Sequence, residues 1–264
     1  MNLFAPLNPP LRAWSDARVW IVGASTGIGA ATAKLMLARG ARVALSARSA
    51  EKLAEVAADA ASSGRAAVEP LDFTDHAAVQ AAWSRVHARW GGIDLVLIVA
   101  GTHEAIRAWE LTDEKARALL ETNLLGVIGT VAAVVPALLA QERGTIGIVS
   151  SASGYGGLPT ALVYGASKAA LVNFAETLYL DLSRRGVGVA LIIPGFVKTP
   201  LTDRNAFRMP CLISADEAAA EIVAGLERGD FEIHFPRAFT RWMKLLRLLP
   251  YRWYFAIVRK VTGL

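Results

Sequence analysis

Short apolar runs alternate along the chain with longer stretches that have helical periodicity. We interpret the short runs as strands, at residues 19–22, 42–46, 66–71, 95–99, 145–149 and 187–193, with a final edge strand at 231–235. Continuous apolar runs of this length are typical of parallel strands buried on both faces. Alternation with helices implies right-handed crossovers between neighbouring strands. The pattern therefore predicts an α/β fold, a doubly wound parallel sheet in a single three-layer α/β/α domain.

The length and the ends of the chain refine this organisation. The 264 residues suit one domain with a substantial core. We expect an amino-terminal extension at residues 1–17, one folded domain at 18–235 and a basic amphipathic helical tail at 236–264. Ser214 with Glu217 three residues later predicts a capping box at the start of a late helix.

Residues 124–140 form an uncharged stretch of 17 residues, which reaches the lower limit for a membrane span. The stretch contains Gly126, Gly129 and Pro136. We interpret it as a helix buried against the sheet, with a subunit interface as a further place for its outer face.

A glycine-rich turn follows the first predicted strand. It reads Gly-Ala-Ser-Thr-Gly-Ile-Gly over residues 23–29, and a helical pattern follows at residues 30–39. Glycines let the backbone approach a pyrophosphate closely, and a helix amino terminus offers free amide hydrogens with partial positive charge. Because the motif lies between a strand and a helix, it predicts a dinucleotide-binding site.

Tyr164 and Lys168 lie one helical turn apart in Tyr-Gly-Ala-Ser-Lys, so both side chains can enter one cleft. A phenol ordinarily ionises near pH ~10, and a neighbouring ammonium favours its ionised form. Ser151 follows the strand predicted at 145–149, and ligands of doubly wound sheets bind at the carboxyl ends of the strands. The three residues together indicate proton transfer to a carbonyl oxygen.

In this order the motifs resemble the short-chain dehydrogenase/reductase family over residues 18–230. The spacing G-x-x-x-G-x-G is similar to that of its compact members and not to the epimerase branch. The resemblance implies a Rossmann-type fold and four catalytic residues, Asn123, Ser151, Tyr164 and Lys168. It implies that a nicotinamide cofactor contacts Gly23, Ser25, Thr26, Gly27, Ile28, Gly29, Ser46, Arg48, Asp72, Ala100, Gly101, Tyr164, Lys168, Pro194, Gly195, Val197 and Thr199.

The resemblance also assigns roles to these positions. Asp72 looks like the adenine-side aspartate, and the segment 194–199 looks like the loop under the nicotinamide. Lys168 would hold the nicotinamide ribose, and Asn123 would position a water that returns a proton through Lys168.

Two positions depart from the family pattern. The family usually has Thr before the first glycine and Asn-Asn before the later Ala-Gly, whereas this chain has Val22 and Ile98-Val99. If the polar partners normally pair between adjacent strands, their joint loss leaves no orphan donor and is nearly neutral. We interpret the change as a repacked core in a working enzyme.

The end of the second strand bears on the choice of cofactor. NAD enzymes commonly place a carboxylate there against the ribose 2′-hydroxyl, but this chain reads Ala-Leu-Ser-Ala-Arg-Ser over residues 44–49. Arg48 offers the planar, permanently charged fork that phosphate recognition favours. We predict NADP, with NADPH preferred over NADH; the alternative is that Arg48 is a solvated surface charge.

The formal charge of +5 is concentrated at the carboxyl terminus. Residues 231–264 hold seven Lys/Arg against Glu232 alone, which gives this segment +6 and the remainder −1. Basic residues at helical spacing with bulky apolar residues between them describe a helix in a membrane interface. An alternative is that these helices cover the substrate cleft or a partner subunit. Nucleic acid is disfavoured because the apolar face is large and no nucleic-acid motif is present.

Taken together, the residues predict an NADP(H)-dependent oxidoreductase that acts on a carbonyl or secondary alcohol of a lipophilic substrate and forms a homo-oligomer. We expect residues 103–109 and 200–213 to line the substrate pocket, and neither segment has a chemical signature that names the substrate. We expect a cytoplasmic protein, peripheral on the inner face of a membrane if the tail binds lipid. The alternative is a non-catalytic NADP(H)-binding scaffold or sensor at a membrane surface. The single cysteine, Cys211, excludes an intramolecular disulfide and is expected to be an apolar filler, and four scattered histidines predict no metal site.

Overall fold

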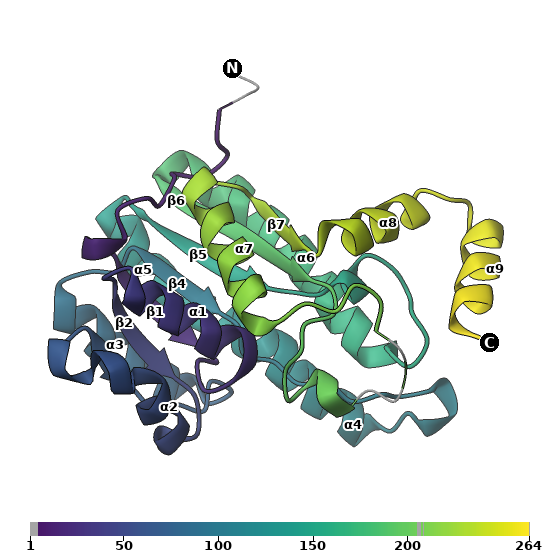
Figure 1. The fold of residues 1–264 in the computed structure, drawn as a ribbon, viewed down its shortest axis with the longest axis horizontal. Coiled ribbons are helices and arrows are strands. Elements are labelled where there is room, and N and C mark those ends of the chain that lie inside the picture. The colour runs from purple at the N-terminus through teal and green to yellow at the C-terminus, as the bar shows by residue number, and fades with distance from the viewer. Residues whose placement is uncertain (1–4, 205–206, 208, 264) are drawn as a thin grey trace.

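The computed structural model describes residues 5–204, 207 and 209–263 of the chain. Within them, seven parallel strands form one sheet in the order β3-β2-β1-β4-β5-β6-β7, shown in Figure 1. The strands are β1 (Arg18–Val22), β2 (Arg42–Ser46), β3 (Ala66–Val68), β4 (Leu95–Ile98), β5 (Gly144–Val149), β6 (Val187–Pro194) and β7 (Glu232–Phe235). The predicted doubly wound parallel sheet is confirmed.

Helices cover both faces of the sheet because successive strand residues point to opposite sides. Along β1, Val19 and Ile21 enter one hydrophobic cluster, while Trp20 and Val22 enter the other. The first cluster lies under α1 (Gly27–Ala38), α2 (Ala50–Ala57) and α7 (Ala215–Arg228). The second lies under α3 (His76–Trp90), α5 (Gly126–Gln141) and α6 (Leu162–Leu182). This arrangement gives the predicted three layers.

The third strand is shorter than the sequence pattern suggested. It ends at Val68 and not at residue 71, although the backbone amides of Glu69 and Leu71 still bond to β2 and the residue after it. Pro70 lies between them at a position where the amide of an edge strand would point away from β2, so it removes no bond to β2. The first helix also begins three residues earlier than expected, at Gly27, so part of the glycine motif forms its first turn.

The predicted buried helix after the fourth strand is confirmed as α5. The continuous helical run Asp113–Gln141, which includes α4 (Asp113–Leu120), is long and apolar enough to span a membrane by composition. In the fold, however, Val127, Val131 and Leu138 of α5 are buried in the core under the sheet. A π-helical turn, Glu121–Leu125, joins α4 to α5. The capping box of Ser214 and Glu217 is also present at the start of α7.

The segment before β1 crosses the amino edge of the sheet. The buried side chain of Asn8 bonds to the backbone nitrogen and oxygen of Val189, at 2.9 and 2.7 Å, and donates to the Asp230 carbonyl at 3.0 Å. The first four residues of the predicted extension lie outside the described residues. The part that is described is therefore fixed to β6.

Two helices follow the last strand, α8 (Arg237–Arg247) and α9 (Tyr251–Thr262). In Figure 1 they extend from one end of the body, with α9 outermost. Met243 and Leu246 of α8 are buried, and Leu246 forms a small cluster with Tyr254 and Val258 of α9. The last residue of the predicted tail lies outside the described residues.

Two of the apolar residues that stand where the family usually has polar ones are neighbours in the core. Val22 of β1 pairs in register with Ile98 of β4, and each is 1% exposed. No buried side-chain nitrogen or oxygen among the described residues lacks a hydrogen-bond partner. The expected joint replacement of polar partners by apolar ones is thus confirmed at this pair.

Candidate active site

A cavity of about 100 Å³ lies at the carboxyl ends of the central strands. Its walls come from the ends of β4, β5 and β6 and from the first turns of α1 and α6. Ser151, Tyr164 and Lys168 all line it, next to Ile28 of the glycine motif and Thr199 of the loop after β6. The structure therefore brings three of the four expected catalytic residues to one small space.

A larger open groove of about 500 Å³ lies at the opposite, amino edge of the sheet, next to Arg18, Arg42 and Gly144. Three helices that flank this edge, α1, α3 and α5, end there with carbonyl groups, whose partial negative charge disfavours an anionic ligand. In doubly wound sheets ligands bind at the carboxyl ends of the strands. The smaller cavity is therefore the candidate site.

Tyr164 lies on the first turn of α6. Burial raises the pKa of its phenol above the ordinary value of 10, while a hydrogen bond with Ser151 acts in the opposite direction. The ammonium of Lys168 lies 5.8 Å from the centre of the Tyr164 ring. The phenol is thus protonated at neutral pH. A protonated phenol is the form that donates a proton.

Ser151 begins a short 3₁₀ turn, Ala152–Gly154, directly after β5 and Ser150. Its hydroxyl oxygen accepts hydrogen bonds from the backbone nitrogen of Ser153 at 3.2 Å and from the Ser153 hydroxyl at 2.9 Å. Because both bonds are accepted, the proton of Ser151 is left to be donated into the cavity. Sequence reasoning missed Ser153, although the repeat Ser-Ala-Ser, which places two hydroxyls two residues apart in a turn, is a usable signal.

Lys168 is buried on α6, one turn beyond Tyr164. Its ammonium donates to the Val149 carbonyl at the end of β5, at 3.1 Å. Burial lowers the pKa of Lys168 from 10.5 to about 8. The group is charged at neutral pH and close to losing its proton in mild alkali. The hydroxyl of Ser150, which donates to the Lys168 carbonyl at 2.7 Å, fixes this part of α6 to the same strand.

Asn123 lies in the π-helical turn and is fully buried. Its amide oxygen accepts from the Thr102 backbone nitrogen at 2.8 Å, and its amide nitrogen donates to the Thr102 carbonyl at 2.9 Å. A side chain added at Gly101 would come within 3.3 Å of the Asn123 amide oxygen and 3.4 Å of the Lys168 ammonium. Asn123 thus lies behind the cavity, next to Lys168, and does not line it.

The glycine motif has the form required for close contact with a phosphate group. A Cβ at Gly29 would fall 2.1 Å from the Gly23 carbonyl oxygen, and a Cβ at Gly23 would fall 2.5 Å from the Ala100 nitrogen. Thr26, the residue before α1, makes no side-chain cap to the helix, so the first-turn amides are not occupied by it. Ser25 is half-buried and Thr26 is exposed beside them. These residues fit the pyrophosphate of a dinucleotide.

The loop after β6 closes the cavity from the other side. Pro194, Gly195, Val197 and Thr199 all line it. A Cβ at Gly27 would fall 2.9 Å from the Thr199 methyl group, so this loop lies directly against the glycine motif. The space expected for a nicotinamide ring is therefore bounded by the loop and by the catalytic side chains.

The surface expected to hold the adenine half of the cofactor is formed by the segments that follow β2 and β3. Arg48 and Asp72 are exposed there. Hydrogen bonds from Thr74, with the Arg48 charge as a smaller cause, lower the pKa of Asp72. The side chain of Ser46 does not face this surface: it is buried and accepts a 2.9 Å hydrogen bond from the Trp20 indole.

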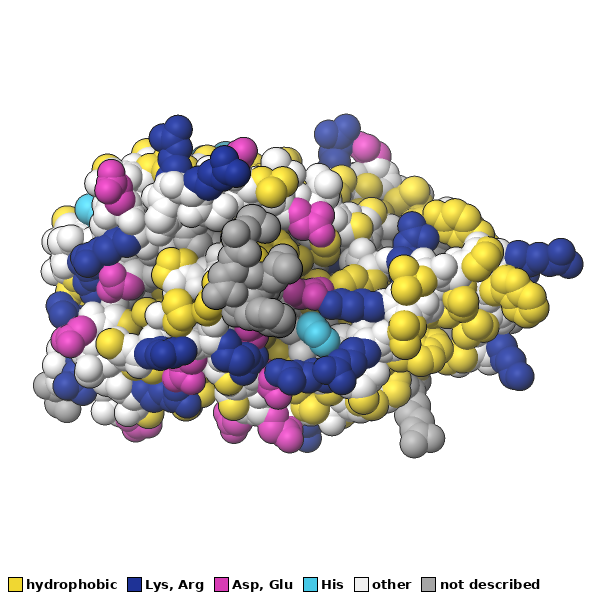
Figure 2. Space-filling view, turned by 90° about the horizontal axis from the view of Figure 1, so that it is seen from above, with side chains coloured by type: hydrophobic (Ala, Val, Ile, Leu, Met, Phe, Trp, Pro, Cys, Tyr) yellow, Lys and Arg dark blue, Asp and Glu magenta, His cyan; other side chains and the backbone are white. Residues whose placement is uncertain are grey.

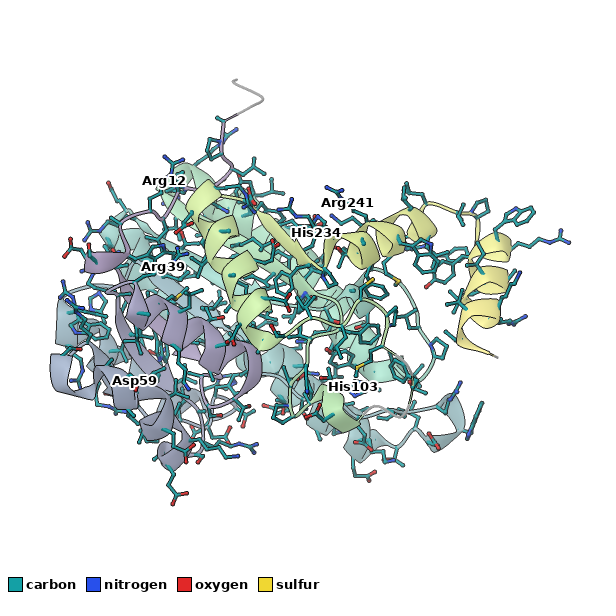
Figure 3. The ribbon with its side chains drawn as sticks, viewed as in Figure 1. Arg12, Arg39, Asp59, His103, His234 and Arg241 are labelled. Atoms are coloured by element: carbon teal, nitrogen blue, oxygen red, sulfur yellow. The ribbon has the colours of Figure 1, made fainter. Side chains whose placement is uncertain are left out.

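His103, which Figure 3 labels, follows the Gly101–Thr102 segment after β4. Its ring meets the Tyr164 ring edge-on, with 4.7 Å between the ring centres and an interplanar angle of 89°. Burial lowers the pKa of His103, so its ring is neutral at pH 7. Residues 103–109 were expected to line a substrate pocket, and His103 is the member of that segment in contact with a catalytic side chain.

The other expected substrate segment is residues 200–213, of which 205, 206 and 208 lie outside the described residues. Leu201 and Thr202 line the cavity. Cys211 is exposed at a turn with a left-handed backbone, φ 55°, so the expectation of an apolar filler was wrong. Among the described residues, no group of three His, Cys, Asp or Glu side chains is placed to hold a metal ion.

Comparison with known proteins shows the family of the chain. The family model described as short chain dehydrogenase matches residues 17–208. The chain belongs to the short-chain dehydrogenase family. Its relatives include an uncharacterized oxidoreductase of Myxococcus xanthus, 36% identical over 243 residues that cover 91% of this chain and 96% of that protein. An uncharacterized oxidoreductase of Staphylococcus saprophyticus is 34% identical over 69% of this chain and 79% of its own.

Solved structures support the same assignment. A short-chain dehydrogenase from Streptomyces avermitilis superposes with a TM-score of 0.78 at 25% identity, covering 94% of this chain and 98% of that one. As a short-chain dehydrogenase, the protein is an oxidoreductase that uses a nicotinamide cofactor, NAD or NADP, and a small-molecule substrate. The family resemblance drawn from the motifs is confirmed.

Proposed function

We propose that this short-chain dehydrogenase reduces a carbonyl group with NADPH and uses Tyr164 as its proton donor. The observation that supports the proposal most strongly is the meeting of Ser151, Tyr164 and Lys168 in one cavity beside the glycine motif. When bound, the nicotinamide cofactor supplies the hydride for the carbonyl carbon.

The proton chemistry follows from the states of the side chains. The Tyr164 phenol, whose pKa is raised by burial, gives its proton to the oxygen of the carbonyl as negative charge develops there. Ser151 donates a hydrogen bond to the same oxygen with the proton that its bonds from Ser153 leave free. Preorganised donors of this kind stabilise the developing charge in a site that excludes water.

Lys168 acts on the phenolate that remains. Its ammonium favours the ionised phenol over a distance of 5.8 Å to the ring centre and, we propose, holds the ribose of the cofactor. Asn123 fixes Thr102 and lies beside Lys168, where it would place the water that returns a proton through the ammonium.

Arg48 supports the preference for NADPH. It lies at the end of β2, and the neighbouring carboxylate of Asp72 is engaged by Thr74 through its backbone nitrogen and hydroxyl. Replacing Arg48→Asp should raise the KM for NADPH by roughly ten- to a hundred-fold, the value of a charge-assisted bond, and leave that for NADH little changed. Steady-state kinetics with both cofactors measure this, and an unchanged ratio of the two KM values would contradict it.

The proposal also covers the class of substrate, the oligomeric state and the location in the cell. The apolar walls of the site region, which include Ile28, Val99 and Leu201, suit a lipophilic carbonyl or alcohol. We further propose a homo-oligomer in the cytoplasm, with a peripheral position on the inner face of a membrane.

A non-catalytic scaffold or sensor that binds NADP(H) at a membrane surface is the second candidate. It would need the cofactor site but not the bonds that orient Ser151. The experiment that separates the two is NADPH oxidation by the purified protein against ketones and aldehydes that range from small and polar to long-chain and sterol-like. Turnover of lipophilic members supports the reductase. NADPH binding without turnover of any member in either direction supports the scaffold.

A further inference from the structure

Exposed hydrophobic side chains are concentrated in the tail. Within the described part of the chain, α8, α9 and the turn between them carry half of the exposed large hydrophobic side chains. They include Trp242, Leu245, Leu248, Trp253 and Phe255. Leu248 is 80% exposed and Trp253 is 64% exposed. Figure 2 shows these yellow side chains gathered at the right-hand end of the molecule, with dark blue side chains at their margins. We call the exposed side chains of residues 237–261 the tail surface.

The tail surface is also strongly basic. Residues 236–264 contain seven Lys/Arg and no Asp/Glu. Lys244 forms an ion pair with Glu232, and Arg237 lies 3.8 Å from Glu221. Within the part of the chain that the structure describes, no ion pair is formed by the other five, Arg241, Arg247, Arg252, Arg259 and Lys260.

Each tail helix presents a defined outer face. On α8 the buried side carries Thr240, Met243 and Leu246, so Leu245 and Leu248 lie on the outer side, where Arg241 is also exposed. Figure 3 shows Arg241 on α8 close to His234 of β7. On α9, Tyr254 and Val258 are buried, and Arg252 and Arg259, two turns apart, share an exposed face beside Phe255.

We propose that the tail surface docks on an anionic lipid bilayer. Apolar and aromatic side chains bordered by cations suit the boundary between headgroups and acyl chains, and each cation gains from the negative potential of the membrane. A second copy of the chain is a poorer occupant. A two-fold contact would place the same surface against itself, and the five cations that form no ion pair among the described residues would then face five more.

The tail surface is connected to the active site by three sets of contacts. The Phe239 ring of α8 lies against Gly195 and 5.2 Å from the Phe196 ring, in the loop that borders the cavity. The Tyr254 hydroxyl of α9 donates to the Gly157 carbonyl at 2.7 Å. Gly157 lies between Ser151 and Tyr164 in the chain.

The third contact is a chain of polar groups. Glu232 accepts a hydrogen bond from the Tyr155 hydroxyl at 2.5 Å and pairs with Lys244 of α8. Tyr155 comes directly after the turn that begins at Ser151. Docking of the tail would therefore hold the segment 155–161, which lies between Ser151 and Tyr164 in the chain, next to the bilayer. This part of the inference rests on the proposed reduction of a lipophilic carbonyl.

Vesicle flotation tests the inference without any need for turnover. The intact protein is mixed with vesicles of phosphatidylcholine and phosphatidylserine, or of phosphatidylcholine alone, at low and high salt. We expect binding to the mixed vesicles that falls at high salt, because salt screens exposed charges. Two tail variants, Leu248→Ser with Trp253→Ser and Arg252→Gln with Arg259→Gln, should each bind at least tenfold more weakly.

Matched controls carry the same changes elsewhere. Leu180→Ser removes a side chain that is 72% exposed on α6, and Arg184→Gln with Arg185→Gln removes two exposed cations. Both should bind as the intact protein does. Absence of flotation by the intact protein, or tail variants that float as well as it does, would overturn the inference. A third result would also overturn it: light scattering shows that the intact protein is a dimer and the tail variants are monomers, while the intact protein does not bind vesicles.

The proposed function can fail separately. A protein that floats and reduces no carbonyl retains the docking surface and refutes the reductase, whereas a protein that reduces carbonyls and does not float refutes the docking surface. Tyr164→Phe should float normally. Tyr254→Phe, which removes the bond to Gly157, should float normally and raise the KM for a long-chain ketone, and an unchanged KM would overturn the link to the site.

Discussion

At the scale of single residues, the direction of the hydrogen bonds around Ser151 matters most. Ser153 donates to the Ser151 oxygen through both its backbone nitrogen and its hydroxyl. Ser153 touches neither the carbonyl nor the cofactor in our account, so it is a positioning residue. It fixes which way the Ser151 proton points.

Replacing Ser153→Ala should therefore lower kcat by roughly fivefold, the worth of one neutral hydrogen bond, with the KM for NADPH unchanged. Ser153→Thr keeps the hydroxyl and should restore most of kcat. Steady-state kinetics of the three proteins give the answer. Equal kcat values for Ser153→Ala and the intact enzyme would show that Ser151 needs no such orientation.

The ionisation of Lys168 predicts opposite effects of pH on activity and on stability. Its pKa is lowered to about 8 by burial, whereas the pKa of Tyr164 is raised. As pH rises through about 8, Lys168 loses the charge that stabilises the phenolate while Tyr164 keeps its proton. The rate of carbonyl reduction, measured as kcat/KM, should fall there. A rate that stays constant to pH 10 would contradict the proposed role of the ammonium.

The free energy of unfolding should respond in the other direction. Between about pH 8 and the ordinary lysine value of 10.5, the unfolded chain binds a proton at Lys168 that the folded chain has lost. The unfolded state therefore binds more protons, and stability contributed by this group rises with pH across that window. Denaturant unfolding of the intact protein and of Lys168→Met measures it, because the variant should lack this contribution.

At the scale of elements, continuous apolar runs were sufficient to locate the strands, since a parallel strand buried on both faces has few polar positions. The exact first and last residues of the elements could not be predicted, because the pattern of apolar residues does not determine them. The strand β3 ended at Val68, and the glycines at 27 and 29 entered the helix that they were expected to precede. The π-helical turn carries Asn123, which bonds to Thr102, 21 residues away in the chain, and no local propensity encodes such a tertiary contact.

The glycine motif gives a prediction at this scale. Replacing Gly29→Ala would place a methyl group 2.1 Å from the Gly23 carbonyl, so the turn between β1 and α1 must shift. We expect a loss of stability of about 1–3 kcal/mol from overpacking and a weaker affinity for NADPH. Gly157→Ala is the matched control, because its Cβ meets no atom within 4 Å.

Thermal unfolding and NADPH fluorescence of both variants check this. If Gly29→Ala bound NADPH as tightly as Gly157→Ala does, the close approach of the backbone in this turn would have no bearing on the cofactor.

At the scale of the whole molecule, the sheet order brings the glycine motif, Ser151 and the loop after β6 to one edge. The motifs predicted this meeting because their order along the chain matches that of the family. The contacts of the tail with the site could not be predicted in the same way. Tyr155 and Glu232 are 77 residues apart, and Tyr254 and Gly157 are 97 apart, so the first pairing depends on the position of β7 in the sheet and the second on how α9 packs.

The central claim is that Tyr164 supplies the proton for reduction of a carbonyl, and turnover by Tyr164→Phe tests it most directly. NADPH binding, measured by fluorescence, should remain close to that of the intact enzyme, because the ring and its contact with His103 are kept. Turnover of a ketone that the intact enzyme reduces should fall by on the order of 10²–10⁴-fold, the contribution of a general acid. Unchanged NADPH binding with turnover within tenfold of the intact enzyme would contradict the account.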